Sequence, residues 1–241
     1  MGSIGEDFYR ETKYAPAEPS VFAPVGPVAL KTVKLPPPRS PSRASLARLL
    51  SKRRSRRAFS GESISLGDLS FLLWASDGKS SRRMPSHLRT APSAGARHPL
   101  DTYCIISHVE GLAPGVYRYR LDEHSLEMLR EGDFRAATVK ATAGQEWTFG
   151  AAVVFAFIAE FARTTSRYKD RGYRYVFLDA GHICQNLYLA AEALSYGVTG
   201  IAALVDDEVN AIVAADGTER SVVYMAALGR PLDTGKGGED A

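Results

Sequence analysis

A long amphipathic segment with strand-like segments on both sides is the feature of this sequence that most limits its fold. Over Tyr175–Tyr196, apolar residues recur every three or four positions, which predicts one helix with a buried stripe. The continuous apolar run Ala151–Ile158 precedes it and predicts a strand covered on both faces. The β-rich stretches Val198–Val205 and Val222–Leu228 follow it. Helices and strands that alternate in this way favour a mixed α/β domain.

The first half of the chain extends this pattern. A leucine stripe predicts a helix that starts near Ala44, and a second helix is expected at Leu66–Ala75, with Ser65 as its N-cap and Gly78 beyond its end. Strands are expected at Thr102–Val109 and Gly115–Arg120. Residues 79–92 are polar and basic without a period, so they predict a loop.

Proline content divides the chain into an arm, a body and a tail. Residues 1–43 hold eight of the thirteen prolines, which favours an extended arm that lies on the body or on a partner subunit. For residues 1–20, a disordered leader is an equally open alternative. Residues 44–232 are expected to form the folded domain, and residues 233–241, rich in Gly and charge, a flexible tail.

Charge and hydropathy limit the functional classes. The net charge of +3, from 30 basic and 27 acidic residues, is too balanced for a protein whose main partner is nucleic acid. The apolar runs are far shorter than the roughly 20 residues of a spanning helix, and the N-terminus lacks the pattern of a signal peptide. Cys104 and Cys184 lie in apolar stretches and predict buried free thiols, which favours a cytoplasmic location.

The run Arg53-Arg54-Ser55-Arg56-Arg57 is a candidate phosphate clamp. In an extended segment Arg53, Ser55 and Arg57 point to the same face, because side chains alternate between faces. Two guanidinium groups and one hydroxyl can hold a phosphate through charge-assisted hydrogen bonds. The alternative is a solvated basic surface or a nucleic-acid patch.

Two other segments could border a flat ring. Ala91–Ala96 consists of small residues that let a ring approach the backbone, with the Ser93 hydroxyl beside it; the alternative is a plain turn. Gly200–Ala203 could present bare backbone N–H groups, and Arg230 could close a phosphate site.

The segment Arg167–Tyr175 holds three tyrosines among several cations, so it is either an active-site rim or a solvated surface. Tyrosine acts as an acid or base when its pKa of about 10 is lowered, and adjacent cations favour the phenolate. Asp179, His182 and Asn186 share one face of the long helix. Asn is a poor third ligand, so these residues predict a polar seam and no metal site.

The order of these motifs resembles the FMN-dependent nitroreductase superfamily, and within it the azoline dehydrogenases of the streptolysin-S kind. The matching stretches are Arg53–Phe59, Leu69–Ala75, Arg89–Ala96, Pro114–Tyr117, Arg171–Tyr175, Ala180–His182, Gln185–Ala191, Leu228–Pro231 and Glu11–Tyr14. The resemblance implies an α+β, nitroreductase-like fold with a central, mostly antiparallel sheet flanked by helices. It also implies a homodimer that binds FMN between its two subunits.

The resemblance gives the motifs roles in FMN binding and catalysis. The implied FMN-binding residues are Arg53, Arg54, Ser55 and Arg57 with Arg230 at the phosphate, Pro92, Ser93, Ala94 and Gly95 beside the flavin, and Gly200, Ile201, Ala202 and Ala203 near its N5 atom. The implied catalytic residues are Arg167, Tyr168 and Lys169.

The sequence departs from the azoline dehydrogenase pattern at three places. Where these enzymes have a Lys-Tyr pair, this chain has Arg167 and Tyr168, and arginine cannot act as a base because it does not lose its proton. Tyr168 remains, with Lys169 one position later. Arg97-His98 replaces Leu-Tyr, and Ala202-Ala203-Leu204 replaces Gly-Ala-Phe.

Three functions remain open on the sequence. The first is an FMN-dependent dehydrogenase that oxidises an azoline-like heterocycle or a peptide-derived substrate, with a cyclodehydratase as an implied partner. The second is an NAD(P)H-dependent nitro- or quinone reductase, which needs no dedicated base. The third is a basic module that binds nucleic acid or other anions, which predicts steep salt dependence and no chromophore.

Overall fold

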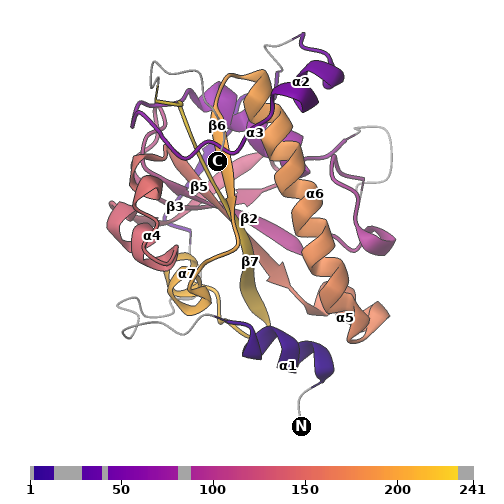
Figure 1. Cartoon of the computed structure of the whole chain (residues 1–241). Coiled ribbons are helices and arrows are strands. Elements are labelled where there is room, and N and C mark those ends of the chain that lie inside the picture. Colours follow the sequence, from indigo (N-terminus) through magenta and orange to yellow (C-terminus); the bar gives the residue numbers. More distant parts are fainter. Residues whose placement is uncertain (1–2, 14–28, 40–42, 81–87, 233–241) are drawn as a thin grey trace.

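A seven-stranded sheet forms the centre of the molecule (Figure 1). The computed structural model describes residues 3–13, 29–39, 43–80 and 88–232. Among these residues the strand order is β1-β4-β3-β2-β5-β7-β6, and every strand pair is antiparallel. The strands are β1 (Lys31–Lys34), β2 (Leu100–Ile106), β3 (Gly115–Arg120), β4 (Ser125–Glu131), β5 (Val153–Glu160), β6 (Gly197–Ile201) and β7 (Arg220–Gly229).

Helices pack on both faces of this sheet. They are α1 (Ile4–Glu11), α2 (Leu46–Lys52), α3 (Leu66–Asp77), α4 (Arg135–Ala141), α5 (Ala162–Tyr168), α6 (Arg171–Ala193) and α7 (Asp206–Val213), with 3-10 turns η1 (Ala94–Ala96) and η2 (Glu146–Gly150). The predicted α+β fold, with a mostly antiparallel sheet flanked by helices, is therefore confirmed for the single chain.

Strand β5 shows why the sheet needs helices on both sides. Its residues alternate between two hydrophobic cores: Phe155 and Phe157 belong to the core under α3 and α6. Val154 and Ile158 belong to the core under α4 and α7. The prediction of a strand covered on both faces is thus confirmed, because seven of the eight β5 residues are buried.

The start of α3 was also predicted correctly, whereas other boundaries differ. The Ser65 side chain accepts a hydrogen bond from the Asp68 N–H and caps the helix. The long helix is Arg171–Ala193, so it begins and ends earlier than the predicted Tyr175–Tyr196. Strand β6 stops at Ile201 and not at Val205, because the Val205 N–H donates to the Ala141 carbonyl in α4 at 2.8 Å. Strand β4 and helices α4, α5 and α7 were not predicted.

Part of the predicted arm, residues 1–43, has regular secondary structure. Within residues 1–43, the structure has the helix α1 and the strand β1, and β1 pairs with β4. A capping box between Ser3 and Glu6 starts α1. Residues 14–28 and the predicted tail 233–241 lie outside the described residues.

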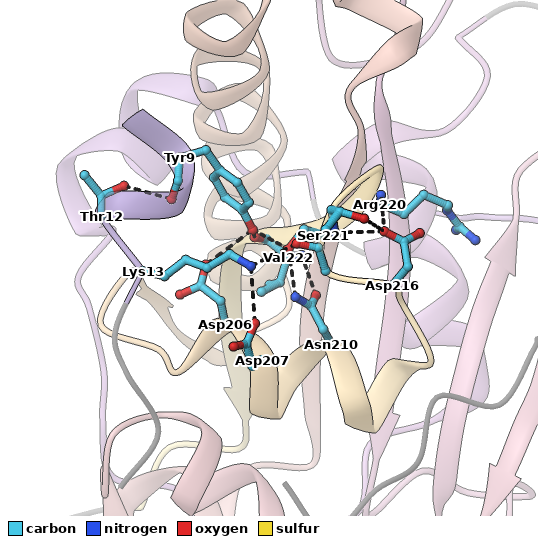
Figure 2. Close-up of polar contacts among 12 residues, drawn as sticks. Tyr9, Thr12, Lys13, Asp206, Asp207, Asn210, Asp216, Arg220, Ser221 and Val222 are labelled. Carbon is cyan, nitrogen blue, oxygen red and sulfur yellow. Dashed lines mark hydrogen bonds and ion pairs between the residues drawn. The ribbon is translucent and has the colours of Figure 1, made fainter. Parts of the chain in front are cut away.

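Tyr9 anchors α1 to the body (Figure 2). The Tyr9 ring is buried, and its hydroxyl donates to the Val222 carbonyl at 3.0 Å and contacts the Ser221 hydroxyl. Asn210 of α7 donates to Ser221 at 2.7 Å and accepts from the Val222 N–H at 2.8 Å, so the anchor reaches both α7 and β7.

Two predictions from hydropathy can be compared with the structure. Cys104 and Cys184 are both buried and free, as expected. In the described part of the chain, no helix is long and apolar enough to cross a membrane.

Candidate functional site

An arginine-rich segment lies against the C-terminal half of α6. The guanidinium carbon of Arg53 lies 5.3 Å from the centre of the Tyr188 ring. The Ser55 hydroxyl oxygen lies 3.0 Å from the Tyr188 hydroxyl oxygen. We call Arg53, Ser55, Arg57 and Tyr188 the arginine cluster.

Backbone contacts with two strands fix this segment. Ser55 forms a β-bridge with Val198 of β6, and Phe59 forms one with Pro231 just after β7. Arg57 lies between these two bridges and is exposed. The segment is therefore held at both ends while the Arg57 side chain faces solvent.

The charges of the arginine cluster fit an anionic ligand. Among the described residues, no carboxylate pairs with Arg53 or Arg57, whereas Arg56 pairs with Glu192 at 2.7 Å. Arg54 donates to the backbone carbonyls of Ser51 and Arg53. Guanidinium groups without a carboxylate partner, next to a hydroxyl, can hold a phosphate through charge-assisted hydrogen bonds.

Arg230 lies beside this segment through its backbone. The Ser60 N–H donates to the Arg230 carbonyl at 3.0 Å. The Arg230 guanidinium, however, donates to the Ser63 carbonyl at 3.1 Å and lies over the Tyr196 ring. Its role as a closing phosphate contact stays a prediction.

The end of β6 and the two residues after it form Gly200–Ala203, the segment that was predicted to present backbone N–H groups to a ring. The Gly200 N–H donates to the Tyr188 hydroxyl at 2.7 Å, so this N–H already has a partner. A Cβ at Gly200 would collide with the Tyr224 hydroxyl, which gives an internal reason for glycine at this position. Ile201 is buried, and Ala202 and Ala203 are exposed beyond the strand. Their contact with a flavin stays a prediction.

A second cluster forms around the loop at η1. The Ser93 hydroxyl donates to Asp179 of α6 at 2.6 Å and accepts from the His98 N–H at 2.9 Å. Burial raises the pKa of Asp179, and the hydrogen bonds from Ser93 and Ala94 oppose this effect. Pro92 is exposed at the start of this loop. The loop is therefore tied to α6 by a partly buried carboxylate.

The hydroxyl of Tyr168 lies against this loop. Gly95 has a φ of +60°, and a Cβ there would collide with the Tyr168 hydroxyl, so both conformation and space favour glycine. Tyr168 is the last residue of α5, and its ring meets the Tyr175 ring edge-on at 5.0 Å. We call Ser93, Gly95, Tyr168, Tyr175 and Asp179 the tyrosine cluster.

The other two predicted catalytic residues flank Tyr168. The Arg167 guanidinium lies 5.5 Å from the centre of the Tyr168 ring, so a cation does accompany this tyrosine. Lys169 is exposed and has a positive φ of 51° at the sharp corner between α5 and α6.

The two clusters lie on different sides of α6. Asp179 and Tyr188 are nine residues apart on this helix, which corresponds to about 14 Å along the axis and about half a turn around it. Within one chain, Arg53 and Ser55 therefore lie together, and so do Ser93, Gly95 and Tyr168. The arginine cluster and the tyrosine cluster, however, lie apart.

Sequence reasoning missed two tyrosines that organise these clusters. Tyr188 joins Ser55 to Gly200, and Tyr224 occupies the space beside Gly200. A buried-stripe pattern does not show such contacts, because they link segments far apart in the chain. The predicted polar seam did indicate that Asp179 and Asn186 pack against neighbours: Asn186 donates to the Ser76 carbonyl at 3.3 Å, while His182 is exposed.

Comparisons with known proteins agree on one family. Residues 50–230 match the Nitroreductase family. A protein of Methanocaldococcus jannaschii named as a nitroreductase is 35% identical over 165 residues, which are 68% of this chain and 82% of that protein. An FMN-dependent nitroreductase of Clostridium difficile is among the solved structures with this fold, with a TM-score of 0.53 at 14% identity, over 81% of this chain and 92% of that one.

Two further matches are a toxin-processing protein and a chain of a synthetase complex. The trifolitoxin-processing protein of Rhizobium leguminosarum bv. trifolii is 36% identical over 118 residues. That match covers 45% of this chain and 31% of the longer relative. A chain in the Escherichia coli microcin synthetase complex shares the fold, with a TM-score of 0.67 at 19% identity, over 94% of this chain and 87% of that one.

Proposed function

Because this chain belongs to the nitroreductase family, we propose that it is an FMN-dependent dehydrogenase that oxidises an azoline-like heterocycle or another peptide-derived substrate. The contact between the Tyr168 hydroxyl and Gly95 carries this proposal, because it puts a proton-transfer group on the loop expected beside the flavin. The match to a trifolitoxin-processing protein supports a peptide-derived substrate.

The chain's own residues suit FMN. In the arginine cluster, Arg53, Ser55 and Arg57 would hold the phosphate, since no carboxylate among the described residues competes for the two guanidinium groups. Ser93 and Gly95 would line the ring. When bound, FMN supplies the hydride acceptor at its N5 atom.

Tyr168 would exchange a proton with the substrate at its hydroxyl oxygen. Arg167 keeps its proton and, from its position over the ring, would help to hold the Tyr168 ring in place. The edge-on contact with Tyr175 would hold the Tyr168 ring in place. Lys169, at the corner that follows, would add positive charge near the substrate.

We propose that a homodimer completes the site. The two clusters lie on different sides of α6, so a flavin held by the arginine cluster of one protomer would need the tyrosine cluster of its partner. A cyclodehydratase that forms the azoline is the expected second partner. The microcin synthetase supports such a partner, because a chain with the same fold is part of that multi-protein complex.

A reductase that uses NAD(P)H and a nitro or quinone substrate is the second candidate. Arg167 favours it, because this position lacks a base and such a reductase can take its protons from solvent.

The first experiment is an absorption spectrum of the purified protein, followed by identification of the molecule that heat releases. A flavin spectrum and released FMN are expected. Turnover of a thiazoline peptide, with slow flavin reduction by NADH and NADPH, would support the dehydrogenase, whereas rapid nicotinamide oxidation would favour the reductase. A colourless protein that takes up no added FMN would contradict both and leave an anion-binding module.

A further inference from the structure

A large cavity lies beside the tyrosine cluster. It has a volume of about 1200 Å³ and lies between α1, the strands β2 and β3, and α5. Small-molecule sites usually enclose about 300–1,000 Å³, so this cavity can take an extended ligand.

The cavity borders the loop that the hydroxyl of Tyr168, the candidate catalytic residue, lies against. Ala96 and Arg97, which follow Gly95 directly, are part of its wall, and so is Thr165 of α5. Since the Tyr168 hydroxyl lies against Gly95, a substrate that reacts at Tyr168 could extend into this cavity.

Helix α1 forms the wall nearest the chain's N-terminus. Glu6 and Arg10 line the cavity together with Tyr9, whose hydroxyl is fixed on β7, and Lys13 lines it just after the helix ends (Figure 2). Lys13 donates to Asp207 at 3.2 Å and to the Gly217 carbonyl at 2.9 Å. The wall is therefore a docked helix with polar anchors on α7 and β7.

The charge of the wall is positive. Eight Lys and Arg side chains and six carboxylates line the cavity, which gives a formal excess of two positive charges. Several of these carboxylates are already paired: Asp77 with Arg89, and Asp101 with both Arg163 and Arg220. Glu160 also pairs with Arg163. Three of the six carboxylates are therefore paired within the wall, and Asp122 pairs with Lys79 outside it.

Two arginines carry the excess. Arg97 donates to the Arg163 carbonyl at 2.9 Å and to the Ser166 hydroxyl at 3.1 Å, which are neutral acceptors. Arg120 lies 3.6 Å from Glu127, the carboxylate that Arg118 already binds at 2.6 Å, and 3.8 Å from Glu123, so both of its ion pairs are longer than a direct hydrogen bond. Both Arg97 and Arg120 are at least one-third exposed, so they can bind a ligand's carboxylate.

We propose that this cavity binds an acidic segment of a peptide, with Arg97 and Arg120 paired to its carboxylates. The proposal rests on the proposed function, in which the substrate is peptide-derived. A peptide held here would place a heterocycle a few residues away beside Tyr168, and the cavity would select substrates with acidic residues near the reacting ring.

The test measures binding directly, without turnover. Fluorescein-labelled octapeptides with four Glu, four Gln or four Lys at the same positions would be titrated with the protein, and fluorescence anisotropy would give the Kd. The Glu peptide should bind at least tenfold tighter than the Gln peptide, more weakly as salt rises, and the Lys peptide should not bind.

Charge-neutralising variants locate the binding. Arg97→Gln and Arg120→Gln should each weaken the Glu peptide by about threefold to tenfold, because each removes one charge-assisted contact. The matched control is Arg135→Gln, which removes the same charge from α4, whose residues do not line the cavity. Circular dichroism would verify that each variant is folded.

The outcomes separate this inference from the proposed function. Equal binding of the Glu and Gln peptides, or equal weakening by Arg135→Gln, would overturn the acidic-segment site. FMN content is measured on the same samples, so a protein with FMN but no peptide preference keeps its function and loses this inference. A protein without FMN that still prefers the Glu peptide keeps the site and loses the function.

Discussion

The arginine cluster and the tyrosine cluster are built in opposite ways. In the arginine cluster, backbone bridges hold an exposed segment and leave Arg53 and Arg57 without a carboxylate partner among the described residues. In the tyrosine cluster, side chains hold each other: Ser93 binds Asp179, and Tyr168 lies against Gly95 and Tyr175.

This difference fits two tasks. A group that binds a strongly charged phosphate needs available charge more than exact position, since charge acts over several ångströms. A group that moves a proton must lie within hydrogen-bond distance of the reacting atom, so it needs a fixed ring. The first cluster should therefore govern FMN affinity and the second should govern rate.

The largest effect should come from Tyr168→Phe. Turnover of the thiazoline peptide should fall by about a hundredfold or more, because general acid–base groups contribute about 10²–10⁴-fold, while FMN content stays unchanged. Tyr175→Phe is the control, since it keeps the ring contact and should cost little. Unchanged turnover in the Tyr168 variant would remove this residue from the mechanism.

The double variant Arg53→Ala/Arg57→Ala should lose FMN affinity and not intrinsic rate. Each charge-assisted bond contributes about 1.5–3 kcal/mol, so the Kd for FMN, measured by flavin fluorescence, should rise by at least about a hundredfold. Excess FMN should restore turnover. The control Arg56→Ala removes the pair with Glu192 and should leave the Kd within a few-fold. If Arg56→Ala also raised the Kd for FMN strongly, the three arginines would be equivalent and the segment would be an ordinary basic surface.

Asp77, whose carboxyl faces the charge of Asp179 in the tyrosine cluster, should make stability depend on pH. Burial raises its pKa to about 7, despite the opposing effect of Arg89. Between about pH 4 and pH 7 the Asp77 carboxyl keeps its proton in the folded chain but has lost it in the unfolded chain. Its contribution to the unfolding free energy is therefore full below pH 4 and is lost as the pH rises to 7.

Urea unfolding from pH 4.5 to 7.5 would measure this effect. The wild type should lose up to a few kcal/mol more of its unfolding free energy over this range than Asp77→Asn does. Parallel curves for the two proteins would mean that Asp77 is ionised throughout, as a pair with Arg89.

The smallest effect is expected at the end of β6. Gly200→Ala should lower the unfolding free energy by about 1–3 kcal/mol, because the new methyl group meets the Tyr224 hydroxyl. Tyr224→Phe removes that oxygen and should restore part of the loss in the double variant, as thermal unfolding would measure. No recovery, together with lost FMN, would indicate that Gly200 serves the cofactor directly.

Patterns with a short period predicted the fold well. The apolar run of β5 and the Ser65 cap of α3 are local features, and both were identified from neighbouring residues. The helix α1 was missed, because eight residues are marginal as an isolated helix and the partners of Tyr9 lie about two hundred residues away.

The sequence predicted which segments form the candidate site but not the side-chain contacts between them. The sequence indicated the arginine segment, the Ser93 loop and Tyr168, but not that the Ser93 hydroxyl binds Asp179 or that Tyr188 joins Ser55 to Gly200. These contacts depend on how α6 is rotated against the sheet, which its own period does not define.

The docking of α1 through Tyr9 and Lys13 also makes this helix a reporter of the cavity. A helix of eight residues that is docked by a few side chains opens as a local unit, so its amide protons should exchange with solvent far faster than those of the central strands. Because residues of α1 line the large cavity, a bound ligand would hold the helix closed and slow that exchange. Occupancy of the cavity can thus be followed at the N-terminal helix, without any signal from the flavin.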